Sequence, residues 1–105
     1  MDAKPAVLVV EDEAAIRSGL CDVLAYHGYA PRAAETGEEG LRCALDLEHA
    51  LVILDVMLPG RSGLDVCREL RARRPEQAIL MLTARGAEED VVEGLRAGAD
   101  DYVTK

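Results

Sequence analysis

The sequence predicts an α/β fold, a doubly wound parallel sheet of five strands covered by helices. Short apolar runs rich in β-branched residues alternate along the chain with longer segments whose apolar residues recur at helical spacing. The alternation repeats roughly every 25 residues, about the length of one strand and helix. The 105 residues have room for one domain, and half of them are hydrophobic, which is enough to form a core.

The first strand is expected at residues 6–10, which are apolar throughout, as a central strand buried on both faces should be. Apolar residues then recur at i, i+4, i+7 and i+8 from Ile16, the spacing of one helical face. This pattern predicts a helix over about 13–27, and Gly28 supplies the left-handed residue that ends it. A weaker run at 29–33 predicts the second strand.

The second helix is expected to begin at Thr36, because a carboxylate follows this hydroxyl three residues later in the form of a capping box. Residues 51–54 are again apolar and predict the third strand, also central in the sheet. Ser62 with Asp65 marks the start of a third helix, which must close before Pro75.

The last part of the chain predicts a fourth strand at 78–82, a helix and a fifth strand at 101–104. Acidic residues at 88–90 favour the positive end of the fourth helix, and Gly98 ends it. Right-handed crossovers between these strands give the flavodoxin-like order 2-1-3-4-5. Ligands of such sheets bind outside the carboxyl ends of the strands, so we expect a functional site there.

Charge and cysteine content exclude several classes of function. Twelve Lys and Arg against twenty Asp and Glu give a net charge of −8, so this chain is not expected to bind nucleic acid or an anionic membrane. No leader-like start or apolar run of about 20 residues is present, and we expect a soluble domain in the cytoplasm. Cys21, Cys43 and Cys67 are expected to be reduced core residues.

Polar residues follow the strands at the edge where a ligand is expected. They are Glu11 and Asp12 after the first strand, Asp55 after the third, Thr83 after the fourth and Lys105 after the fifth. Each has an ordinary explanation when taken alone, because acids cap helices and turns, Thr favours strands and a Lys is usually solvated. At one edge of one sheet, however, they predict a shared polar site.

The chemistry of this predicted site favours a divalent cation. Three carboxylates repel one another unless they share a cation, and oxygen ligands without His or Cys suit Mg²⁺. With the charge neutralised, Asp55 can attack phosphorus as a nucleophile. Mg²⁺, the Lys105 ammonium and the Thr83 hydroxyl would each contact one phosphoryl oxygen, which predicts acyl-phosphate formation on Asp55.

Over essentially its whole length the chain resembles the receiver domain of bacterial two-component response regulators. The resemblance rests on residues 9–13, the loop 55–60, residues 83–85 and residues 98–105, which occur in the order and spacing of that family. It implies a sensor histidine kinase as the phosphoryl donor, Asp55 as the acceptor and Lys105 as a contact of the phosphoryl group. It implies that Glu11, Asp12, Asp55 and the carbonyl of Met57 hold Mg²⁺.

The same resemblance implies a switch, in which the Thr83 hydroxyl moves toward the phosphoryl group and the Tyr102 ring turns inward. The stretch 100–102 looks like the OmpR/PhoB subfamily, whose members carry a DNA-binding output domain. The family continues beyond this Lys into a fifth helix, so residues 1–105 are expected to be a receiver domain truncated at its C-terminus. The apolar surface left by that helix would favour dimerisation, exchange of elements or partial disorder. The OmpR/PhoB resemblance implies that a homodimer would form through the fourth helix and fifth strand.

Three functions therefore stay open. The leading one is a phosphorylation-controlled switch that regulates a transcriptional output and assists its own phosphorylation and dephosphorylation, without being an enzyme for other substrates. A second is an interaction module that works without phosphorylation. A third is a phosphatase of the haloacid-dehalogenase type, which the sequence disfavours because that family places a second Asp two residues after the nucleophile, where this chain has Met57.

Overall fold

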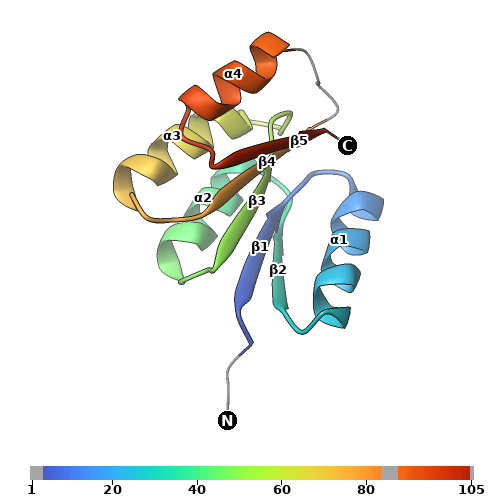
Figure 1. The fold of residues 1–105 in the computed structure, drawn as a ribbon. Helices are drawn as coiled ribbons and strands as arrows, with labels where there is room; N and C mark the ends of the chain where they lie inside the picture. The colour runs from blue at the N-terminus through green and yellow to red at the C-terminus, as the bar shows by residue number, and fades with distance from the viewer. Residues whose placement is uncertain (1–3, 84–87, 105) are drawn as a thin grey trace.

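A computed structural model describes residues 4–83 and 88–104, and its strands form one parallel sheet in the order β2-β1-β3-β4-β5. The strands are β1 (Ala6–Val10), β2 (Ala30–Ala34), β3 (Leu51–Asp55), β4 (Ile79–Thr83) and β5 (Asp101–Thr104). The helices are α1 (Ala14–Tyr26), α2 (Gly37–Asp46), α3 (Gly63–Arg73) and α4 (Glu88–Arg96). Helix α1 lies on one face of the sheet, and α2, α3 and α4 lie on the other (Figure 1). The predicted fold class and strand order are confirmed.

The central strands contribute side chains to two apolar clusters, one on each face of the sheet. Leu8 and Val10 of β1 join the main cluster on the side of α2 and α3. Val7 and Val9 join Ile53 in a smaller one, the α1-side cluster, which also includes partly buried side chains from α1 and β4. Since successive side chains of a strand point to opposite faces, a strand covered on both faces must be apolar throughout. This explains why the three fully apolar runs lie in the middle of the sheet.

The helices begin where the sequence predicts. Thr36 is the N-cap of α2, and its Oγ1 accepts a hydrogen bond from the Glu39 N–H at 3.1 Å. Ser62 caps α3 in the same way, accepting from the N–H of Asp65 at 3.3 Å. Each cap satisfies a backbone donor that has no partner within the helix. None of the helices in residues 4–83 and 88–104 combines the length and apolar character needed to cross a membrane.

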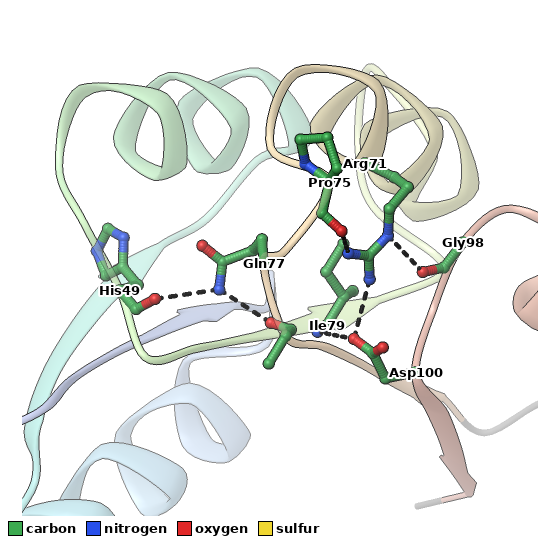
Figure 2. Close-up of polar contacts among 8 residues, drawn as sticks. His49, Arg71, Pro75, Gln77, Ile79, Gly98 and Asp100 are labelled. Atoms are coloured by element: carbon green, nitrogen blue, oxygen red, sulfur yellow. Dashed lines mark hydrogen bonds and ion pairs between the residues drawn. The ribbon is translucent and has the colours of Figure 1, made fainter.

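A polar network lies at the end of the sheet where β4 and β5 begin (Figure 2). The Arg71 guanidinium donates to the carbonyl oxygens of Pro75 at 2.7 Å and Gly98 at 2.9 Å, and it pairs with Asp100 at 2.9 Å. The Asp100 carboxylate also accepts from the Ile79 N–H at 2.7 Å. These bonds join the end of α3 to the start of β4 and to the turn that leads from α4 into β5.

Candidate metal centre

Three acidic residues meet at the carboxyl ends of β1 and β3, which are neighbours in the sheet. Val10 lies opposite Leu54 in the register of these strands, so the residues that follow them come side by side. One carboxylate oxygen each from Glu11, Asp12 and Asp55 lies within 4.8 Å of the other two. The structure thus brings together the three carboxylates that the sequence places at this edge.

The surrounding backbone holds two of these carboxylates in place. Glu11 and Asp55 are buried, with 1% and 4% of their surface exposed, whereas Asp12 is exposed. The Glu11 carboxylate accepts a hydrogen bond from the Glu13 N–H at 3.2 Å, and Asp55 Oδ1 accepts one from the Met57 N–H at 3.2 Å. A buried carboxylate needs such donors because it has lost its hydration. The backbone therefore orients both side chains before any ligand binds.

Gly63, the first residue of α3, lies so close to the backbone of Asp55 that this position has no room for a side chain. A Cβ atom at Gly63 would overlap the carbonyl oxygen of Asp55 and crowd the Cα of Val56. The Gly63 N–H donates to the Val56 carbonyl at 2.9 Å and thereby closes the loop after β3. A glycine at this position lets α3 start directly beside the candidate site.

The donor set fits Mg²⁺. Its atoms are hard carboxylate oxygens, the ligands that Mg²⁺ prefers, and two of the three carboxylates are buried where their mutual repulsion is poorly screened. A shared divalent cation would relieve that repulsion. The Met57 N–H donates to Asp55 Oδ1 and the Met57 side chain is exposed, while the carbonyl of this residue remains a predicted ligand.

The other predicted site residues are placed in part. Thr83 ends β4 at the same edge, but its side chain and the whole of Lys105 lie outside the described part of the chain, so their roles stay predictions. Tyr102 lies in β5 with its side chain partly buried against the main cluster. Its ring rests on α4, because a Cβ atom at Gly94 would collide with it.

One residue near the cluster escaped the sequence analysis. Arg17 of α1 donates to the carbonyl oxygens of Glu11 at 2.9 Å and Asp12 at 3.2 Å, and it pairs with Glu35 at 3.2 Å. A signal was present in the sequence, because a cation near the amino end of a helix is unfavourable unless acceptors lie close by. Helical spacing alone identifies the apolar face of α1 and says nothing of this contact.

Comparisons with known proteins give a matching family and similar relatives. The response regulator receiver domain family matches residues 7–105. The transcriptional regulatory protein AfsQ1 of Streptomyces coelicolor is 46% identical over 96% of this chain and 44% of its own length. The two-component response regulator PhoP of Pseudomonas aeruginosa is 50% identical over 94% of this chain and 44% of its own. The chain thus spans less than half the length of these relatives.

Solved structures show the same fold. A CheY-like response regulator receiver domain protein from Methanospirillum hungatei superposes with a TM-score of 0.93 at 30% identity, covering 98% of this chain and 82% of that one. The receiver domain of DrrB, described as BeF3-activated, superposes with a TM-score of 0.90 at 36% identity, covering 98% and 86%.

Proposed function

The chain belongs to the response regulator receiver domain family, and from that premise we propose that Asp55 is the phosphoryl acceptor of a Mg²⁺-dependent signalling switch. The observation that carries the proposal is the acidic cluster, in which the buried Asp55 carboxylate lies within 4.8 Å of oxygens from Glu11 and Asp12. Such a cluster serves phosphoryl transfer, because a bound cation offsets the charge of both the acceptor and the incoming phosphoryl group.

The proposed reaction takes a phosphoryl group from the phosphohistidine of a sensor histidine kinase. An oxygen of Asp55 forms a bond to phosphorus as the P–N bond of the phosphohistidine breaks, and the imidazole nitrogen takes a proton from water. The Met57 N–H fixes the Asp55 carboxylate through Oδ1, and burial excludes competing water. When bound, Mg²⁺ supplies the positive charge that lets the two anions approach. We assign contacts with the phosphoryl oxygens to Lys105 and Thr83.

The proposed output involves the surface formed by α4 and β5. Thr83 and Tyr102 are assigned as the switch pair, and the position of the Tyr102 ring against Gly94 supports this role, because movement of the ring must alter its contact with α4. Val92 and Leu95 are exposed hydrophobic residues of α4, which suits a homodimer through this helix and the neighbouring β5. In a longer, cytoplasmic protein, the altered contact between Tyr102 and α4 would control a DNA-binding output domain.

The test is phosphorylation of the chain by acetyl phosphate in the presence of Mg²⁺, followed by intact mass spectrometry. We expect one added phosphoryl group that hydroxylamine removes, as it removes acyl phosphates. The variant Asp55→Ala should gain none, and the matched control Asp65→Ala, which changes an exposed aspartate of α3, should behave as the parent. An equal gain in Asp55→Ala would contradict the proposal, and no gain in the parent would favour the interaction module.

A further inference from the structure

The guanidinium group of Arg17 donates to two backbone carbonyls of the loop that carries Glu11 and Asp12. We propose that Arg17 is a positioning residue for Mg²⁺: by holding the backbone carbonyls of Glu11 and Asp12 it keeps their carboxylates directed toward Asp55. This inference rests on the function proposed above and extends it to a residue outside the acidic cluster.

The contacts of Arg17 reach three parts of the chain at once. From α1, Nη1 donates to the carbonyl oxygens of Glu11 at 2.9 Å and Asp12 at 3.2 Å, while Nη2 pairs with Glu35 in the loop after β2 at 3.2 Å. Only 17% of the Arg17 side chain is exposed, compared with 66% for Glu35. Hydrogen bonds from a charged donor in a shielded position are stronger than neutral ones. The guanidinium thus connects the acidic loop with the neighbouring loop.

The type of acceptor matters for metal binding. Arg17 donates to the carbonyl oxygens of residues 11 and 12, and among the described residues it forms an ion pair with Glu35, which lies outside the acidic cluster. The bonds therefore fix the backbone of the loop without occupying the carboxylate oxygens that a cation would need. In the metal-free chain the three carboxylates repel one another, and a loop held by its carbonyls resists being pushed away from Asp55.

Other contacts among the described residues also hold the loop. The Glu11 N–H donates to the carbonyl of Ala34 at 3.0 Å, and the Glu13 N–H donates to the Glu11 carboxylate. Glu13 is the N-cap of α1, but its side chain makes no capping hydrogen bond to the described residues. Of the residues of α1 that the structure describes, none is fully buried. Helix packing alone therefore fixes the entry into α1 weakly, which gives Arg17 its importance.

An arginine suits this position better than a lysine. The planar guanidinium presents several N–H donors in a fixed arrangement, whereas an ammonium group is a single point charge on a flexible chain. Arg17→Lys keeps the positive charge but cannot hold both carbonyls and Glu35 together. The substitution therefore separates positioning from charge, since removal of the charge alone would strengthen the attraction of the acidic cluster for Mg²⁺.

The experiment is calorimetric titration of the 105-residue chain and its variants with MgCl₂. Groups that orient metal ligands from outside the coordination sphere typically change metal affinity by about 10- to 100-fold, and we expect Arg17→Lys to weaken Mg²⁺ binding about tenfold. Arg68→Lys is the matched control on α3, and Glu35→Gln removes the ion-pair charge while leaving the carbonyl bonds. Both should bind Mg²⁺ as the parent does.

Two further measurements distinguish positioning from general destabilisation. The rise in Tm on adding Mg²⁺ reports binding even in a variant of lower stability, and it should shrink in Arg17→Lys. In the metal-free chain, hydrogen exchange of the Glu13 amide should become faster in Arg17→Lys than in Arg68→Lys. Parental Mg²⁺ affinity in Arg17→Lys, unchanged exchange at Glu13, or an equal loss in Glu35→Gln would each overturn the inference. Failure of the parent to bind Mg²⁺ would instead overturn the proposed function, and this inference with it.

Discussion

At the scale of single residues, Gly63 determines how closely the start of α3 can approach Asp55. A Cβ atom at this position would overlap the Asp55 carbonyl oxygen, and the obstructing atom belongs to the backbone of a central strand, which cannot turn away as a side chain could. The same carbonyl belongs to the residue whose carboxylate faces the candidate metal site. A side chain at position 63 would therefore displace the backbone of Asp55 and change the geometry of that site.

We predict that Gly63→Ala lowers the free energy of unfolding by about 3 kcal/mol, the upper part of the range for overpacking, because backbone must move. Urea denaturation measures this change. Gly19 in the middle of α1 is the matched control, because a Cβ atom there would meet open space. Gly19→Ala should stabilise the chain by roughly 0.5–1 kcal/mol, the usual difference between these residues inside a helix. Equal effects of the two substitutions would contradict the overlap at Gly63.

At the scale of elements, Asp100 joins β4, β5 and the end of α3. The hydrogen bond from the Ile79 N–H holds the pKa of the Asp100 carboxyl below its usual range. The Arg71 guanidinium lowers this pKa further. Because the folded pKa lies below the unfolded value of about 3.9, the bonds of ionised Asp100 stabilise the fold fully above that pH. This contribution is lost as the pH falls through the folded pKa.

We therefore predict that Asp100→Asn destabilises the chain at neutral pH and that its difference from the parent shrinks as the pH falls below about 4. Urea denaturation over a pH series measures both free energies of unfolding. Asp22→Asn, on the exposed side of α1, serves as the control and should follow the parent at every pH. If the difference in free energy of unfolding between Asp100→Asn and the parent stayed constant below a pH of about 4, ionisation of Asp100 would not contribute to stability.

The elements also show which parts of this fold can be predicted from the sequence. The caps at Thr36 and Ser62 depend on residues three positions apart, so local sequence identifies them. The order of strands follows from the handedness of the crossovers and the apolar runs, and the predicted strand limits differ from the observed ones by no more than one residue.

Contacts between distant residues could not be predicted in the same way. Arg17 and Glu35 lie 18 residues apart, and Arg71 and Asp100 lie 29 apart. A sequence pattern shows which residues share a face of their own element, but the direction of a long side chain across a loop depends on the assembled fold. This is why the acidic cluster could be predicted from strand ends, while the contacts of Arg17 could not.

At the scale of the whole molecule, the two faces of the sheet are covered unequally. Leu80 and Leu82 of β4 belong to the α1-side cluster, and Val103 of β5 lies opposite Leu82 in the register. In the described part of the chain the only helix on this face is α1, which packs against β1 and β2. Both leucines are only partly buried and Val103 is 42% exposed, although β4 is a central strand. Residues 4–83 and 88–104 therefore leave an apolar strip exposed along β4 and β5.

This strip, defined by Leu80, Leu82 and Val103, predicts that the isolated 105-residue chain self-associates. The net charge of −8 opposes contact between copies, and salt screens that repulsion, so association should increase with ionic strength. Sedimentation velocity over a range of chain and salt concentrations measures it. Val103→Thr keeps the shape of the side chain but adds a hydroxyl to the strip, and it should weaken association. Val23→Thr makes the same change at an exposed position of α1 and should leave association unchanged. A parent chain that stayed monomeric at high salt, or equal effects of the two substitutions, would show that association does not proceed through this face.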